Sequence, residues 1–327
     1  MYVYNISRSN NIVPITILCS LILGLLSYFT GGIEQPETWN NALWNIGSFF
    51  AKSNFMFFGI NTLILLISGW ILYKISEYFT LSQHRSYLPF LFFILFEFTS
   101  TPLTYISKGS FVFLFVIPAL ITLFQSFQER NSSNFAFLTG MFLGLLSFIW
   151  IKGLILVPIF IIGYGIMRSL TFRSFLALIL GTLSIFWIEF VYFFFNDESL
   201  KFISQFKDIF HISIIDINSL SVPTLIMLSV TLFFSIITGG NLFFSSYLEK
   251  IKTQMCYKFL LLLNFFGWAS LIFSNGRMSC ELSLIFISLA MMTSNFFQGN
   301  ERKYKNVLFI LMIATYLFVY VMRVWID

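Results

Sequence analysis

The sequence predicts an all-α fold, a polytopic transmembrane helical bundle of about 11 spans (10–12), with two short interfacial helices on the outer face. Hydrophobic residues make up 58% of the chain and charged residues 10%, whereas about 25% of residues are charged in soluble domains. A chain this apolar cannot cover its own surface with polar groups, so lipid must be its solvent. Because no polar stretch is long enough to form a core, we expect a single membrane domain over residues 1–327 and no soluble domain.

One apolar run, residues 135–167, is too long to be a single span. As one helix it would measure about 50 Å at roughly 1.5 Å per residue, and the hydrocarbon core of a bilayer is about 30 Å thick. Lys152 and Gly153 stand in the middle of the run and mark the tip of a hairpin. Lys108 and Gly109 stand in a similar position, where they open another apolar stretch.

The first apolar run has the flanks of a signal peptide, but it is long and no small-residue cleavage site follows it. We therefore expect an uncleaved first span with a cytoplasmic N-terminus. A count of ten or twelve spans stays open, because the third, fifth and sixth are short. The expected spans are Ile12–Phe29, Phe55–Tyr73, Tyr87–Phe98, Gly109–Phe124, Phe135–Ile151, Gly153–Met167, Phe175–Phe195, Val222–Thr238, Phe259–Phe273, Glu281–Phe297 and Val307–Trp325.

Two polar loops on the predicted outer face contain apolar residues at helical spacing, which is typical of helices lying on a membrane surface. The first set is Trp39, Leu43, Ile46 and Phe50, and the second is Phe202, Ile203, Phe206, Ile209 and Phe210. On the opposite side, we expect Gly239–Lys258 to be a basic loop.

The net charge of +5 reports basic loops and not a nucleic-acid partner, because no Lys/Arg cluster is dense enough to bind nucleic acid. With a cytoplasmic N-terminus, the cytoplasmic loops carry more lysine and arginine than the outer loops, as the positive-inside rule requires. We expect a multi-pass protein of the bacterial inner membrane. The three cysteines and two histidines show no metal-binding spacing, so we expect neither a disulfide framework nor a Cys/His metal site.

Three cationic residues fall at tight tips on the predicted outer face: Lys108, Lys152 and Arg277. One interpretation is a cationic ring that binds a phosphate or pyrophosphate head group. The alternative is that each side chain only reaches into the head-group region from a helix end. Their positions in space decide between the two interpretations.

Four acidic residues are candidates for chemistry. Glu34 and Glu37, in the first outer loop, could act as a general base or bind a divalent cation, or they could be ordinary solvated acids. Glu97 and Glu189 lie within apolar runs, where ionisable groups are costly and often functional. Glu97 is close enough to a span end to be hydrated instead. Pairing of Glu189 with Lys152 or Arg277 would neutralise both charges.

Motifs for ATP-driven or hydrolytic chemistry are absent: the sequence has no glycine-rich phosphate loop, no HExxH and no GxSxG. Transport driven by ATP on this chain alone is therefore excluded. Proton-coupled transport through Glu97 and Glu189 is not.

Several segments carry a resemblance to known families. RSYLPFLFFILF, KGSFVFLFVIPALITLF, FLTGMFLGLLSFIWIKGLILVPIFIIGYGI and FVYFFFND resemble an uncharacterised Bacteroidetes-type family of inner-membrane proteins, a domain of unknown function. GLLSFIWIKGLILVPIFII is more distantly similar to polyprenyl-phosphate-dependent glycosyltransferases of the GT-C fold.

The GT-C resemblance implies an acidic catalytic residue and an amphipathic helix after the first span, which Glu34 or Glu37 before Trp39–Phe50 matches. It also implies that Lys152 and Arg277 hold a lipid phosphate. The sequence departs from the family in having no aspartate in this loop, no periplasmic C-terminal domain and a short chain.

Three functions remain open at this point. The leading hypothesis is GT-C-like handling of a lipid-linked sugar at the outer leaflet, with membrane lipid and polyprenyl phosphate as partners. The alternatives are a lipid or small-solute transporter or flippase, and a non-catalytic assembly subunit. We expect no cofactor, although a divalent cation is possible, and the sequence does not identify a protein partner.

Overall fold

The computed structural model describes residues 12–30, 55–81, 86–100, 107–197, 220–245, 249–274, 278–298 and 303–326, together with Phe202, Phe206, Ile209 and Ile215. Within these ranges the chain is helical, with turns and short connections between the helices. The helices are α2 (Ile12–Thr30), α4 (Phe55–Tyr78), α5 (Leu88–Ser100), α6 (Lys108–Gln125), α7 (Ser133–Ile149), the 3-10 helix η1 (Ile151–Ile155), α8 (Leu156–Ile166), α9 (Phe172–Phe195), α12 (Val222–Ser245), α13 (Ile251–Ile272), α14 (Ser279–Gln298) and α15 (Lys303–Ile326).

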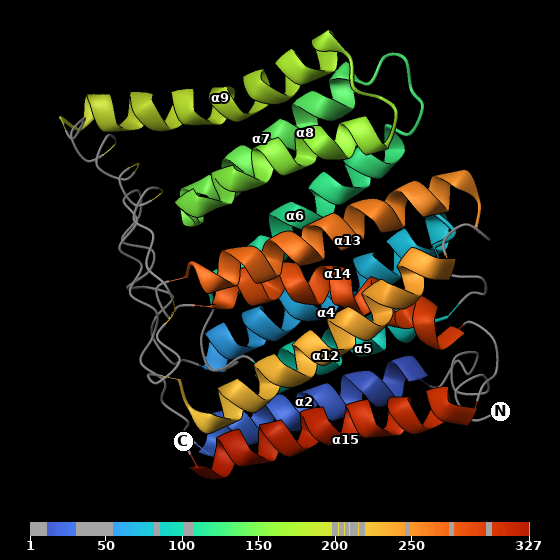
Figure 1. Cartoon of the computed structure of the whole chain (residues 1–327). Coiled ribbons are helices and arrows are strands. Elements are labelled where there is room, and N and C mark those ends of the chain that lie inside the picture. The colour runs from blue at the N-terminus through green and yellow to red at the C-terminus, as the bar shows by residue number, and fades with distance from the viewer. Residues whose placement is uncertain are drawn as a thin grey trace.

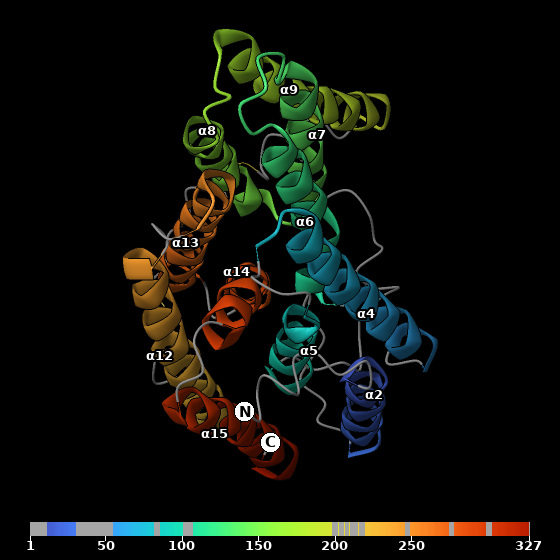
Figure 2. The same cartoon turned by 90° about the vertical axis from the view of Figure 1, so that its right-hand side faces the viewer.

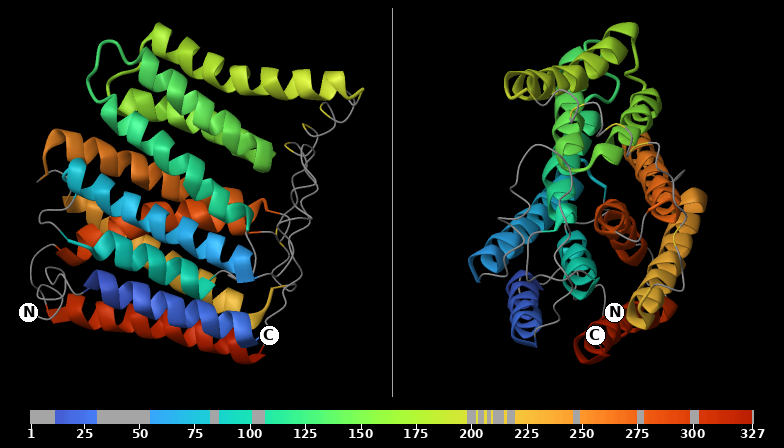
Figure 3. Two further views of the ribbon diagram at one scale, coloured as in Figure 1. Left: turned by 180° about the vertical axis from the view of Figure 1, so that it is seen from behind. Right: turned by 90° about the vertical axis from the view of Figure 1, so that its left-hand side faces the viewer.

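Successive helices run in alternating directions across the bundle (Figures 1 and 3). We call the side at which α5, α7, α9 and α13 end the Lys152 face, which is on the left of Figure 1, and the opposite side the Lys252 face. Each of the eleven predicted spans corresponds to one of the α-helices, with η1 leading into α8. Seven of these helices are long and apolar enough to cross a membrane, and four are shorter apolar helices. The predicted polytopic helical membrane protein is confirmed.

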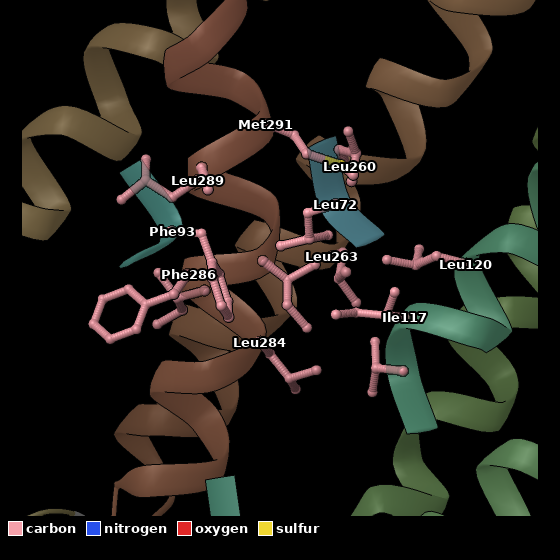
Figure 4. Close-up of a cluster of buried hydrophobic side chains, with 14 of the residues drawn as sticks. Leu72, Phe93, Ile117, Leu120, Leu260, Leu263, Leu284, Phe286, Leu289 and Met291 are labelled. Carbon is pink, nitrogen blue, oxygen red and sulfur yellow. The ribbon is translucent and has the colours of Figure 1, made fainter. Parts of the chain in front are cut away.

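Helix α14 occupies the centre of the bundle (Figure 2). It packs against α4, α5, α6, α12 and α13, and its whole apolar stretch is buried inside the protein. In the close-up of the core, Leu284 and Leu289 of α14 lie in one buried cluster with Phe93 of α5, Ile117 of α6 and Leu263 of α13 (Figure 4). Helices around the rim, such as α15, bury a much smaller share of their surface.

Helices α7 and α9 pack with their backbones in direct contact. A Cβ added to Gly140 would lie 2.1 Å from the carbonyl oxygen of Leu178, and one added to Gly181 would lie 2.3 Å from that of Phe137. Gly144 repeats the close approach one turn later, against Ile185. Glycines four residues apart let membrane helices approach in this way, because no side chain separates the two backbones.

The predicted basic loop Gly239–Lys258 is wrong for most of its length. Helix α12 continues to Ser245 and α13 already begins at Ile251, so Lys252 and Lys258 lie within α13. Gly239 stays helical, and a Cβ there would meet the Leu261 side chain at 3.3 Å, so packing between the two helices supports this part of α12. Lysines are compatible with the end of a membrane helix because their long side chains reach the head-group region.

The predicted hairpin at Lys152 and Gly153 is confirmed. Helix α7 ends at Ile149, both residues lie in η1, and α8 returns from Leu156. A Cβ at Gly153 would lie 3.2 Å from the side chains of Leu146 and Trp150. The turn therefore folds tightly back onto the last turn of α7.

Candidate functional site

The candidate site is built around the connection between α13 and α14 on the Lys152 face. Lys152 reaches one side of this connection, where its Nζ donates a hydrogen bond of 3.4 Å to the carbonyl oxygen of Phe273, the residue that ends α13. Carbonyls at a helix C-terminus carry partial negative charge and attract cations. Lys152 is partly exposed, so its ammonium group remains accessible at this face.

Lys108 lies on the other side of the same connection. It is the first residue of α6, whose N-terminus is capped by the Ser107 side chain, which accepts a hydrogen bond from the backbone N–H of Ser110. The neighbouring Gly109 touches the start of α14, since a Cβ there would lie 2.7 Å from the carbonyl oxygen of Ser279. The first turn of α6 is held in place by a buried hydrogen bond of 2.6 Å from Ser110 Oγ to Asn61 Oδ1 of α4.

Two of the three predicted cations therefore flank one connection. Lys152 contacts the end of α13, and Lys108 adjoins the residue that packs on the beginning of α14. Arg277 belongs to the same connection by its position in the chain but lies outside the described residues. The tertiary fold thus places Lys108 and Lys152, which are far apart in the sequence, next to the two ends of the same connection.

The acidic residues divide into two groups. Glu34 and Glu37 lie outside the described residues, as does the first predicted interfacial helix, Trp39–Phe50. Glu97 and Glu189 are each only 2% exposed. The alternative that Glu97 is hydrated near a span end is therefore wrong for the described structure.

Glu189 lies near the Lys152 face. Helices α7 and α9 run in the same direction, and Gly144 of α7 packs on Ile185 of α9. Glu189 comes four residues after Ile185, which is about 6 Å further along α9. Because Ile185 packs on Gly144, Glu189 lies at the level of the end of α7. The predicted pairing with Lys152 is wrong, because among the described residues the partner of the Lys152 ammonium is the Phe273 carbonyl. Arg277 lies outside the described residues, so the pairing of Glu189 with Arg277 stays a prediction.

A third buried acid, Glu281, is not among the predicted site residues. It lies in the first turn of α14 on the Lys152 face and is 3% exposed. The helix macrodipole favours a carboxylate in this position. The sequence shows only that Glu281 opens an apolar run, which marks it as the boundary of a span.

The second predicted interfacial segment is partly visible. Phe202 packs on Phe190 and Phe193 of α9 at ring-centroid distances of 5.5 and 6.1 Å, and Phe206 packs on Phe186 at 5.6 Å. These two predicted face residues thus turn toward α9, at about the level of Glu189. Of the other three residues on this predicted face, Ile209 is among the described residues, whereas Ile203 and Phe210 lie outside them.

No group of three or more His, Cys, Asp or Glu side chains that could hold a metal ion occurs among the described residues. The candidate acids for a divalent cation in the first outer loop, Glu34 and Glu37, fall outside them.

Comparison with known proteins gives a fold likeness. No protein-family model matches the chain and no curated protein matches it, so the resemblance to the Bacteroidetes-type family finds no support. The chain is similar to the oligosaccharyltransferase AglB from the archaeon Archaeoglobus fulgidus in complex with an inhibitory peptide and a dolichol-phosphate, with a TM-score of 0.53 and 9% identity. The match covers 96% of this chain and 56% of that chain.

The apo form of an Archaeoglobus fulgidus oligosaccharyltransferase matches with a TM-score of 0.48 and 10% identity, over 94% of this chain and 52% of that chain. The chain thus spans about half the length of these solved structures. At such identity the AglB likeness shows a shared fold, which supports the GT-C resemblance predicted from the segment around Lys152.

Proposed function

We propose that this protein is a GT-C-like membrane protein that handles a lipid-linked sugar, with polyprenyl phosphate as its lipid carrier. The observation that carries the proposal is the placement of Lys108 and Lys152 on the two sides of the α13–α14 connection. Two lysines next to one connection would suit a phosphate, because charge-assisted hydrogen bonds to phosphate oxygens are strong. The fold likeness to AglB, whose structure contains a dolichol-phosphate, supports the same chemical class.

The proposal assigns a role to each candidate residue. Lys108, Lys152 and Arg277 hold the phosphate, and Glu34 or Glu37 acts as the general base on the acceptor hydroxyl, with or without a divalent cation. The Lys152 face is the outer face of a bacterial inner membrane, the N-terminus is cytoplasmic, and residues 1–327 act as one membrane domain.

The test compares Lys152→Ala and Glu37→Gln with Lys74→Ala in cells that depend on this chain. Lys74 is an exposed lysine that pairs with Glu77 at 3.0 Å near the Lys252 face, so it controls for loss of a surface charge. Both site variants are expected to lose the cell-surface glycan or glycolipid, while the control keeps it. Unchanged glycan in both site variants, at wild-type protein levels, would overturn the proposal.

A second candidate function is supported by the buried acids. Glu97 and Glu189 are each 2% exposed inside predominantly apolar helices, and intramembrane carboxylates are often part of proton or ion pathways. This favours a lipid or small-solute transporter as the alternative. Purified protein in liposomes that moves a fluorescent lipid or a solute, and stops doing so in Glu189→Gln, would favour transport over sugar transfer.

A further inference from the structure

The hydroxyl of Ser274 is a buried hydrogen-bond donor with no acceptor among the residues that the structure describes. Ser274 is 1% exposed and lies two residues beyond the end of α13. Its backbone N–H is satisfied, since it donates to the carbonyl oxygen of Leu271 at 3.1 Å. A buried hydroxyl that makes no hydrogen bond costs free energy, so such a group in a native structure calls for an explanation.

Other serines at this end of the bundle behave differently. Ser270, one turn earlier on α13, donates its hydroxyl to the carbonyl oxygen of Gly267 at 2.9 Å. Ser283 of α14 donates to that of Ser279 at 2.8 Å. Both use the carbonyl three or four residues earlier in their own helix, as serines in helices commonly do. Ser274 has left the helix and does not use one.

Ser274 follows directly after Phe273, the residue whose carbonyl oxygen accepts the Lys152 hydrogen bond. Lys152 Nζ lies 3.4 Å from the carbonyl oxygen of Phe273, and that carbonyl belongs to the peptide group that joins Phe273 to Ser274. An ammonium group has three N–H donors, and the structure describes one long hydrogen bond for this one. An ammonium from η1 and a hydroxyl from the end of α13 thus adjoin a single peptide group.

We propose that the Ser274 hydroxyl donates a hydrogen bond to the same phosphate group that Lys152 binds. This inference rests on the proposed function and adds a neutral donor to its cations. The carbonyl end of α13 disfavours an anion, but the N-termini of α6 and α14 lie at the same face and favour one. The donor set, an ammonium and a hydroxyl, fits the oxygens of a phosphate ester and finds no negative charge on a polyprenol, whose hydrogen bonds would be weaker.

The test measures binding of a short-chain polyprenyl phosphate, of the matching polyprenol and of inorganic phosphate to the purified full chain in detergent. The variants are Ser274→Ala, the nearly isosteric Ser274→Cys, Lys152→Ala, and Ser270→Ala as the matched control. Ser274→Ala is expected to weaken binding of the polyprenyl phosphate about tenfold, the effect of one hydrogen bond to a charged group. Polyprenol binding and the Ser270→Ala variant are expected to stay at the wild-type level.

Thermal unfolding of the free protein gives a second measurement. Removing a buried donor that has no acceptor leaves the unfolding midpoint unchanged or raises it, so Ser274→Ala is expected to lose affinity without losing stability. If its midpoint falls, Ser274 has a structural role and the inference is overturned.

The remaining outcomes separate the two proposals. Wild-type affinity in Ser274→Ala and Ser274→Cys, together with weakened binding in Lys152→Ala, overturns the role of Ser274 and leaves the proposed function standing. Unchanged binding in Lys152→Ala, or a wild-type protein that does not bind the polyprenyl phosphate, overturns both. If inorganic phosphate binds as tightly as the lipid and with the same dependence on Ser274, the phosphate contact is supported but its source is a soluble anion, which contradicts the lipid-linked function.

Discussion

Gly181 of α9 packs directly on the carbonyl oxygen of Phe137 in α7, so closely that a Cβ at Gly181 would lie 2.3 Å from that oxygen. The contact fixes α9 against α7 and places Glu189, two turns further along α9, at the level of η1 and Lys152. The position of Glu189 relative to the candidate site therefore depends on a helix contact made at some distance from both.

We expect Gly181→Ala to destabilise the protein by about 2 kcal/mol or more, because one of the two backbones must move to make room for the methyl group. The matched control is Gly240→Ala in α12, where a Cβ would meet nothing within 4 Å. That variant is expected to be neutral or more stable by up to about 1 kcal/mol, since alanine is the better helix former. Denaturation in mixed detergent micelles measures both, and equal effects would contradict the packing of α7 on α9.

The hydrogen bond between Ser110 and Asn61 holds the first turn of α6, and with it Lys108. We expect Ser110→Ala to cost about 1–2 kcal/mol, because it removes a buried donor from the Asn61 amide oxygen. A double-mutant cycle with Asn61→Ala measures the coupling between the two side chains. Independent effects of the two substitutions would show that this bond does not anchor α6.

The Lys152 face is expected to be accessible from outside the cell. In intact cells, a membrane-impermeant maleimide is expected to label a Lys152→Cys variant, and to label Lys74→Cys only after the membrane is permeabilised. The unmodified chain controls for the native cysteines, of which Cys256 and Cys280 are buried. The reverse labelling pattern would show that the N-terminus is outside.

Phe202 is expected to attach the segment that follows α9 to that helix. Its ring packs on Phe190, Phe193 and Phe206, so Phe202→Ala is expected to increase proteolysis between residues 197 and 220 without unfolding the bundle. Phe195→Ala, at a ring that is 80% exposed, serves as the control. Equal protease resistance of both variants would argue against this contact.

The sequence alone predicted the order of the apolar helices that the structure describes, and left their number at ten to twelve. Each apolar run is a local property of the chain, and the thickness of a bilayer decides where a long run must turn, so the hairpin at Lys152 and Gly153 could be predicted. Helix starts were less accurate where lysines lie inside a helix, as Lys252 and Lys258 do in α13. A hydropathy profile assigns such residues to a loop, although their long side chains are compatible with the end of a membrane helix.

Only the tertiary structure decided which helix is central and which residues meet. Helix α14 is less apolar than α15, yet α14 is buried and α15 lies at the rim, because lipid-facing and core-facing surfaces of a membrane protein are similarly apolar and hydropathy does not distinguish them. For the same reason the burial of Glu281 could not be predicted. The placement of Lys108 and Lys152 next to the α13–α14 connection required the packing of α6 on α14 and the contact of η1 with the end of α13, which link residues far apart in the sequence.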